Sequence, residues 1–160
     1  MFLGALQKFK FKGKEWVDSL KAKCDKNEKI NAELIQADSV PMSYYNSCGT
    51  IKKYLPQDCI LVGEGANTMD IGRTIFTHEK PKRKLDAGTF GNMGIGLPAI
   101  ISAQTCNPEL WTVAVMGDSA FGFSCMECET LTRYKLGAVI FIINNNGIFS
   151  GTETLEGNPQ

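Results

Sequence analysis

The chain has 160 residues, enough for one domain with a full hydrophobic core but too few for a large enzyme. Hydrophobic residues make up 43% of it, which excludes a chain that is disordered by composition. Its 17 basic and 17 acidic residues cancel, so there is no electrostatic basis for binding nucleic acid or an anionic membrane, and we expect neither partner.

The apolar runs are shorter than the roughly 18 residues that a membrane span needs, so we expect no membrane span. The first 14 residues mix phenylalanines with lysines and lack the apolar stretch and cleavage site of a signal peptide. Six cysteines are scattered along the chain, which favours a reducing compartment over a disulfide scaffold.

Residues 14–38 are polar and rich in lysine, with a few apolar anchors, which predicts an exposed helix or helix pair. Pro41 ends this stretch, and short apolar runs then alternate with helical patterns. We therefore predict a boundary at this point. This boundary separates residues 1–40 from residues 41–160.

Three short apolar runs beyond Pro41 predict buried strands. They occupy residues 59–62, 111–116 and 138–143. Helical patterns lie around them at residues 43–54, 68–76, 94–106 and 124–134. Because the runs are continuously apolar, both faces of each strand should be covered, as in a parallel sheet. The alternation of strands and helices predicts an α/β fold, a three-layer α/β/α domain with a parallel sheet.

Two of these predicted strands end in residues that can bind a cation. Asp118 follows the second run, and Asn144 and Asn145 follow the third. In a right-handed βαβ unit both strand ends lie at one edge of the sheet, about 4.8 Å apart, so Asp118 and Asn145 should reach one cation. Hard oxygen ligands suit Mg²⁺ or Ca²⁺, and Mg²⁺ commonly takes further oxygens from phosphates, which implies a diphosphate partner.

The residues around these strand ends support the same interpretation. Ser119 to Gly122 open a helix with small residues and free N–H groups, which favours an anion site. Gly147 allows a tight turn and can present its carbonyl to a metal. Taken singly, each segment is more typical of an ordinary turn with a helix cap. Occurring 27 residues apart across a βαβ unit, Asp118 and Asn145 together favour the cation.

The segments Gly117–Ser119 and Asn144–Asn145 resemble the fingerprint of thiamine-diphosphate enzymes, Gly-Asp-Gly followed about two dozen residues later by Asn-Asn. The surrounding sequence is more similar still to the branch that contains 2-hydroxyacyl-CoA lyase and oxalyl-CoA decarboxylase. The stretches that carry this similarity lie at residues 64–73, 85–91, 117–124, 126–130 and 133–134.

The resemblance implies thiamine diphosphate and Mg²⁺ as cofactors, with Asp118, Asn145 and the Gly147 carbonyl as metal ligands. Diphosphate contacts would come from Asn67, Ser119 and Ala120, an aminopyrimidine contact from the carbonyl of Gly91, and the wedge that bends the cofactor from Met93. The full set of implied cofactor-binding residues is Tyr44, Ala66, Asn67, Gly91, Met93, Ser119, Ala120, Asn145, Gly147, Ile148 and Phe149.

The implied reaction is cleavage of a 2-hydroxyacyl-CoA to formyl-CoA and an aldehyde one carbon shorter. An oxalyl-CoA decarboxylase-like activity and a noncatalytic cofactor-binding fragment remain alternatives. Arg73 is the candidate contact for coenzyme A, although charge pairing at a helix C-terminus is the simpler interpretation. The basic residues 80–84 are a weaker candidate for the same ligand, since a solvated loop explains them equally well.

The resemblance also implies what this chain lacks. The glutamate that activates the cofactor belongs to the family's amino-terminal domain on a partner subunit, so we expect no catalytic residue here and no activity from this chain alone. Residues 1–40 would then end a central domain, and residues 41–160 would be a pyrophosphate-binding domain truncated at its C-terminus. A homo-oligomer, dimer or tetramer, and a peroxisomal location are expected from the family, although this chain carries no targeting signal.

Three positions depart from the branch. Phe149 stands where the branch has tyrosine, Cys125 replaces a glycine and Gly137 a proline. Cys125 and Cys128 form a C-x-x-C pair, for which a helix surface is a better interpretation than redox or zinc chemistry.

Overall fold

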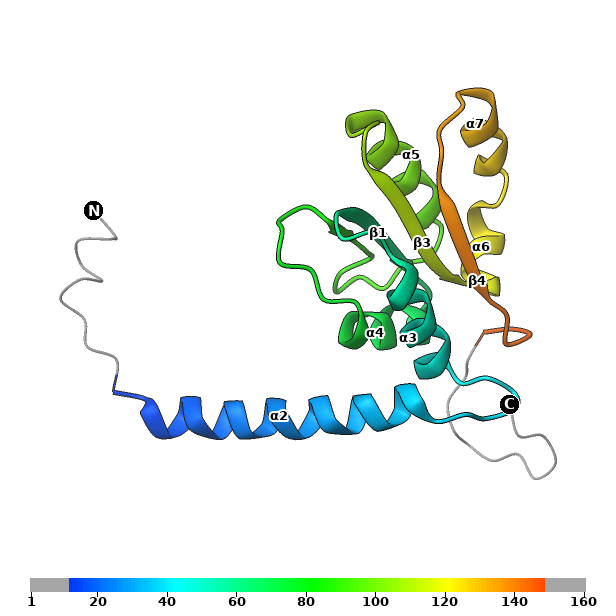
Figure 1. Cartoon of the computed structure of the whole chain (residues 1–160). Coiled ribbons are helices and arrows are strands. Elements are labelled where there is room, and N and C mark those ends of the chain that lie inside the picture. The colour runs from blue at the N-terminus through cyan, green and yellow to red at the C-terminus, as the bar shows by residue number, and fades with distance from the viewer. Residues whose placement is uncertain (1–11, 149–160) are drawn as a thin grey trace, which may run out of the picture.

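The computed structural model describes residues 12–148, which form a parallel sheet with helices on both faces and one long helix beside it (Figure 1). The helices are α2 (Lys14–Gln36), α3 (Tyr44–Tyr54), α4 (Ala66–Ile75), α5 (Gly96–Cys106), α6 (Asp118–Ser124) and α7 (Glu127–Arg133). The strands are β1 (Cys59–Glu64), β2 (Lys84–Leu85), β3 (Trp111–Gly117) and β4 (Val139–Ile143).

The sheet has the order β2-β1-β3-β4, and all three neighbouring pairs are parallel. The three predicted strands are confirmed, within a residue or two at their ends. β2 was missed because it pairs through only two residues, too few to produce an apolar pattern. Continuous burial is confirmed for β1 and β3, whereas β4 lies at the edge and leaves Phe141 and Ile142 partly exposed.

Successive residues of β1 and β3 point to opposite faces, and each face has its own core. On one face Leu61, Val113 and Val115 pack against α3 and α4. The opposite face carries α5, α6 and α7, packed on Val62 and Met116. The predicted three-layer α/β/α architecture is therefore confirmed.

The helix predicted over residues 124–134 was wrong in extent. The chain after β3 forms two short helices, α6 and α7, separated at Cys125 and Met126. Across this break the N–H of Cys128 donates to the carbonyl of Cys125 (3.1 Å) and that of Glu129 to Met126 (3.1 Å). These tighter i→i+3 bonds replace the α-helical pattern and change the chain direction between the two helices.

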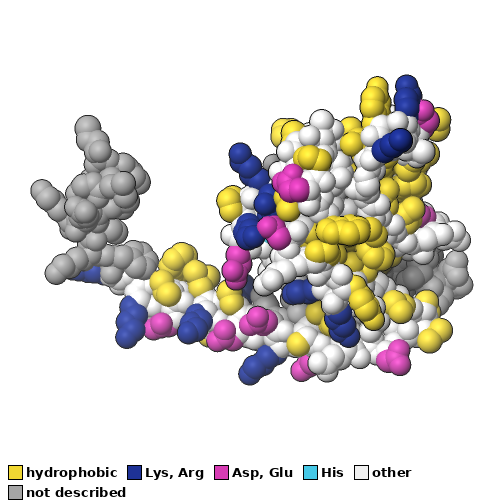
Figure 2. Space-filling model, turned by 45° about the horizontal axis from the view of Figure 1, so that its top comes forward, with side chains coloured by type: hydrophobic (Ala, Val, Ile, Leu, Met, Phe, Trp, Pro, Cys, Tyr) yellow, Lys and Arg dark blue, Asp and Glu magenta, His cyan; other side chains and the backbone are white. Residues whose placement is uncertain are grey.

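The long helix predicted before Pro41 is confirmed as α2, whose described residues are all at least partly exposed. Figure 2 shows charged side chains of both signs along it, mixed with a few hydrophobic ones. Only its C-terminal end docks on the domain: Ile35 packs against the α3 side of the core, and Asn46 Nδ2 donates to the carbonyls of Ile35 (3.0 Å) and Ala37 (3.2 Å). None of the helices in the described part of the chain is long and apolar enough to cross a membrane.

The buried core should contribute far more to stability than the exposed helix α2. Ile100 is fully buried, so Ile100→Ala should lower the free energy of unfolding by about 2–5 kcal/mol, through lost burial and a cavity. The matched control is Ile30→Ala on α2, a side chain 43% exposed, which should change stability by no more than about 0.5 kcal/mol. Urea denaturation measures both, and equal losses would contradict this placement of the core.

Candidate functional site

Chemically capable side chains gather at the carboxyl edge of the sheet. Glu64 and Met116 are partners in the β1–β3 register, and Gly117 and Ile143 are partners in the β3–β4 register. The segments that follow these three strands therefore start side by side, as the βαβ argument predicts. Together with the start of α3 and the chain around Met93, they enclose a small cavity of about 120 Å³.

The cavity brings together residues that lie far apart in the sequence. Its lining consists of Tyr44, Gly65, Ala66, Asn67, Gly91, Met93, Gly117, Asp118, Ser119, Ala120, Asn145, Gly147 and Ile148. Every residue predicted from the sequence to contact cofactor or metal is in this set except Phe149, which lies outside the described residues. Arg73, predicted to contact substrate, is not part of the lining.

Three oxygen-bearing groups converge at one end of the cavity. The terminal amide of Asn145 lies 3.1 Å from Asp118 Oδ1 and 2.7 Å from the Gly147 carbonyl oxygen. If the amide oxygen occupies this position, three acceptors face one another. Ligands 2.0–2.1 Å from an octahedral Mg²⁺ stand about 2.9 Å from their neighbours, so this spacing fits a shared cation. The described residues contain no group of three His, Cys, Asp or Glu side chains that could hold a metal elsewhere.

The same amide can also satisfy the site without an ion. With its nitrogen turned inward, Asn145 donates to Asp118 Oδ1 and to the Gly147 carbonyl, and its oxygen accepts from the Tyr44 hydroxyl at 3.2 Å. Burial raises the pKa of Tyr44, and the nearby Asp118 carboxylate raises it further, so its hydroxyl keeps its proton. In this orientation the Asn145 side chain links Asp118, Gly147 and Tyr44.

Backbone geometry brings the Gly147 carbonyl to this point. The N–H of Asn146 donates to the Asn144 side chain at 2.8 Å, and Asn146 adopts φ 71°. This Asx-type turn directly follows β4 and folds the chain back toward Asp118.

Two helix N-termini border the rest of the cavity. α4 begins at Ala66 and α6 at Asp118, and neither has a side-chain cap within the described part of the chain. Backbone N–H groups of a first helical turn have no partner inside the helix, so those of Asn67, Ser119 and Ala120 are suited to bind an anionic group.

Gly91 and Met93 come from the segment between β2 and α5. Gly91 has φ 61° and open space where a Cβ would stand. Sequence reasoning missed the residue that supports this segment. Glu64, at the end of β1, is fully buried and accepts hydrogen bonds from the N–H groups of Gly94, Ile95 (3.1 Å) and Gly96 (2.9 Å). An acidic residue that closes a buried apolar strand is the signal that could have identified it.

Arg73 lies outside the cavity and faces the same segment. Its guanidinium forms a two-pronged contact with the carboxylate of Asp86, with both N–O distances 2.9 Å, and donates to the Gly88 carbonyl at 3.0 Å. Arg73 also lies 3.3 Å from Asp70. The hydrogen bond from Arg73 holds the pKa of Asp86 below its usual value. The coenzyme A contact of Arg73 stays a prediction, and its observed partners belong to this chain.

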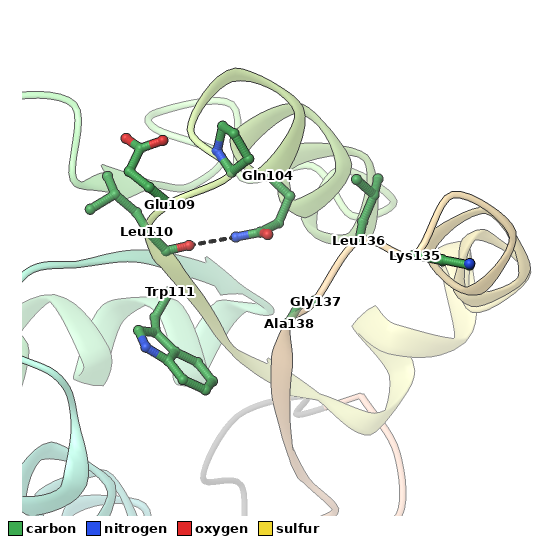
Figure 3. Close-up of a pocket in the computed structure, with 9 residues that line it drawn as sticks. Gln104, Glu109, Leu110, Trp111, Lys135, Leu136, Gly137 and Ala138 are labelled. Carbon is green, nitrogen blue, oxygen red and sulfur yellow. Dashed lines mark hydrogen bonds between the residues drawn. The ribbon is translucent and has the colours of Figure 1, made fainter.

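The larger cavities lie at the amino edge of the sheet. One of about 440 Å³ is formed where α5 leads into β3 and α7 leads into β4 (Figure 3). The amide of Gln104, which points into this region, donates to the Leu110 carbonyl (2.7 Å) and to the Thr112 hydroxyl (2.8 Å). The basic loop also lies at this edge, where Lys80 and Arg83 pair with Asp58 just before β1. The length of β3, on the order of 20 Å, separates these groups from Asp118.

Residues at the α6–α7 break lie away from the cavity lining. Cys125 and Cys128 are free thiols, half-buried at this break. Glu129 pairs with Arg133 one turn along α7, at 2.5 Å. Cys128 and Glu129 agree with the sequence interpretation of a helix surface, whereas Cys125 lies in the break between the two helices.

Comparison with known proteins places this chain in a family. Residues 63–157 match the family described as thiamine pyrophosphate enzyme, C-terminal TPP binding domain. Human 2-hydroxyacyl-CoA lyase 1 is 46% identical over 144 residues, which are 88% of this chain and 25% of that protein. Oxalyl-CoA decarboxylase of Escherichia coli K12 is 44% identical over 138 residues, 85% of this chain and 24% of that protein. The chain thus spans about a quarter of the length of these relatives.

Solved structures share the fold at lower identity. Benzoylformate decarboxylase from Polynucleobacter necessarius superposes with a TM-score of 0.62 at 20% identity, covering 69% of this chain and 22% of that one. A thiamine diphosphate-dependent 4-hydroxybenzoylformate decarboxylase from Rhodococcus jostii RHA1 gives 0.59 at 24% identity, covering 65% and 20%. With the family match over more than half of its length, this chain belongs to the thiamine pyrophosphate enzymes and carries their C-terminal TPP-binding domain.

Proposed function

We propose that this chain forms the cofactor-binding part of a thiamine-diphosphate-dependent lyase that cleaves a 2-hydroxyacyl-CoA to formyl-CoA and an aldehyde one carbon shorter. The main support for this proposal is the polar cavity at the carboxyl edge of the sheet, in a chain that is 46% identical over 144 residues to human 2-hydroxyacyl-CoA lyase 1. The Asn145 amide lies 3.1 Å from Asp118 Oδ1 and 2.7 Å from the Gly147 carbonyl oxygen, close to the separation of neighbouring ligands on octahedral Mg²⁺, which supports magnesium as the second cofactor.

Each part of the cofactor has suitable residues in the cavity. The N–H groups of Asn67, Ser119 and Ala120 would hold the diphosphate, next to a cation on Asp118. When bound, thiamine diphosphate supplies an electron sink for breaking the C–C bond. Gly91 would accept a hydrogen bond through its carbonyl, which requires the close approach that a glycine permits. Met93 would press against the cofactor to keep it bent.

Two glutamates of the described residues do not fit the role of the group that activates the cofactor. Glu64 is buried and its carboxylate already accepts three backbone N–H bonds, so it is not available to the cofactor. Glu129 is engaged by Arg133 on α7. This supports the proposal that the activating glutamate comes from the amino-terminal domain of a partner subunit in a homodimer or homotetramer. A peroxisomal location is proposed on the same resemblance.

Oxalyl-CoA decarboxylation is the second candidate, because the Escherichia coli decarboxylase is nearly as similar to this chain as the human lyase. A chimera separates the two. The matching segment of human 2-hydroxyacyl-CoA lyase 1 is replaced by this chain, and aldehyde release from a 2-hydroxyacyl-CoA is compared with CO₂ release from oxalyl-CoA. Aldehyde release is expected to dominate. Predominant CO₂ release would favour the decarboxylase, and a folded, cofactor-loaded chimera without either activity would favour a noncatalytic fragment.

Asp118 supplies the only charged metal ligand proposed here. Asp118→Ala should weaken Mg²⁺-dependent binding of thiamine diphosphate by more than about tenfold, and Asp118→Asn should do less harm because an amide oxygen can still coordinate. Calorimetric titration of the chain measures this. Asp58→Asn, a carboxylate at the opposite edge, should leave the affinity unchanged. Unchanged affinity in Asp118→Ala would refute the metal assignment.

Met93 is proposed to orient the cofactor rather than to anchor it. In the chimera, Met93→Ala should lower kcat by about 100-fold while changing cofactor affinity much less, because misplacement by about 1 Å is that costly for reaction. Met126→Ala is the matched control, since that side chain is 79% exposed. Equal losses of kcat and affinity would show that Met93 contributes only to packing.

A further prediction concerns the activity of this chain on its own. Purified residues 1–160, saturated with thiamine diphosphate and Mg²⁺, should release no aldehyde from a 2-hydroxyacyl-CoA, because the activating glutamate is proposed to lie on another domain. Aldehyde release is followed by gas chromatography, with the chimera as positive control. Turnover by the isolated chain would place the activating group within it.

A further inference from the structure

The segment that carries Gly91 and Met93 has little structure of its own. Residues 86–95 form neither helix nor strand in the described chain, and three glycines, Gly88, Gly91 and Gly94, have positive φ values of 58°, 61° and 90°. Such a segment loses much conformational entropy when it is ordered. Contacts from outside the segment must therefore hold Gly91 and Met93 at the cavity.

Glu64 holds the C-terminal end of this segment. Its carboxylate, buried at the end of β1, accepts from three successive N–H groups, those of Gly94, Ile95 and Gly96. The backbone approaches so closely that a Cβ on Gly96 would collide with Glu64 Oε2 and lie 2.6 Å from Met116 Cε. A buried carboxylate is costly unless its hydrogen bonds are satisfied, and here the partners are all backbone groups of this segment.

Capping of α5 explains only part of this arrangement. Gly96 is the first residue of α5, so its bond to Glu64 satisfies an N–H without a partner inside the helix. Gly94 lies two residues before the helix, and its N–H bond to Glu64 fixes the segment next to Met93 instead.

Arg73 holds the N-terminal end. The two-pronged contact with Asp86 fixes the residue after β2, and the bond to the Gly88 carbonyl extends the contact two residues further. Asp86 itself accepts from the Gly88 N–H at 2.8 Å. Arg73 and Glu64 lie on α4 and at the end of β1, so both ends of the segment are tied to one rigid β1–α4 unit.

Building on the proposed function, we propose that Glu64 and Arg73 are positioning residues, which hold residues 86–96 so that Gly91 and Met93 are in place before thiamine diphosphate binds. For Arg73 this differs from a contact with coenzyme A. In this structure Asp86 and Gly88 already engage the planar fork of the Arg73 guanidinium, so its observed contacts serve the segment and not a ligand.

The test is hydrogen exchange of the ligand-free 160-residue chain, read by mass spectrometry over residues 86–96 and over β3. The variants are Glu64→Gln, which removes the charge and one acceptor oxygen, and Arg73→Lys, which keeps the charge but loses the fork. Glu129→Gln and Arg133→Lys are matched controls, because they alter an exposed ion pair on α7.

We expect exchange over residues 86–96 to accelerate by more than about tenfold in Glu64→Gln, with β3 unchanged. Arg73→Lys should accelerate exchange mainly over residues 86–90.

Titration with thiamine diphosphate and Mg²⁺ adds a second readout. Both variants should bind the cofactor more weakly than the controls, and its near-ultraviolet circular dichroism signal should shrink at saturation, since the bent conformation is less well defined. Unchanged exchange over residues 86–96, or equal acceleration over β3, overturns the proposal. If Glu64→Gln does not fold, Arg73→Lys decides, because that side chain is on the surface. Lack of cofactor binding by the unaltered chain contradicts the proposed function instead, and the exchange data still decide whether the two residues hold the segment.

Discussion

Parallel pairing of β3 with both β1 and β4 is the constraint on which the rest of the structure depends. Parallel strands covered by helices on both faces can carry few polar side chains along their length, because each would be buried without a partner. Polar side chains instead occur where the strands end. The β1–β3 and β3–β4 registers bring those ends together, so Glu64, Asp118 and Asn145 lie near one cavity although Glu64 and Asn145 are 81 residues apart in the sequence.

Cavity volume is a poor guide to chemistry in this molecule. The larger spaces lie at the amino edge, where Gln104 and Asp58 already have partners, although the buried Nε2 of His78 has none among the described residues. The carboxyl-edge cavity is smaller, yet two helix starts without side-chain caps border it. The Asp118 carboxylate and the Gly147 carbonyl also line it, and both lie within hydrogen-bonding distance of the Asn145 amide. A charged ligand is recognised by such groups rather than by empty space.

The sequence predicted those parts of the fold that depend on local patterns. The apolar runs identify β1, β3 and β4 because burial demands them, and Asp118 and Asn145 follow because strand ends in a parallel unit meet. β2 escaped notice because two residues cannot form a pattern. The role of Glu64 and the partners of Arg73 were not predicted, because these partners are 30–32 and 13–15 residues away, in a segment whose shape comes from the contacts themselves. The helical pattern around Cys125 and Cys128 likewise gave no sign of the break between α6 and α7.

The hydrogen bonds of the Asn145 amide would set a condition on the cation proposed for this site. With its nitrogen facing them, the amide donates to Asp118 and Gly147 and accepts from Tyr44, so these groups satisfy one another. A cation bound through the Asn145 oxygen would have to replace these bonds, and its apparent affinity would fall by the fraction of molecules in the receptive state. The binding energy of a lone cation would have to offset the lost hydrogen bonds, whereas for a cation that binds with an anionic partner the contacts of both would offset them. The proposed site should therefore bind a cation and an anion together.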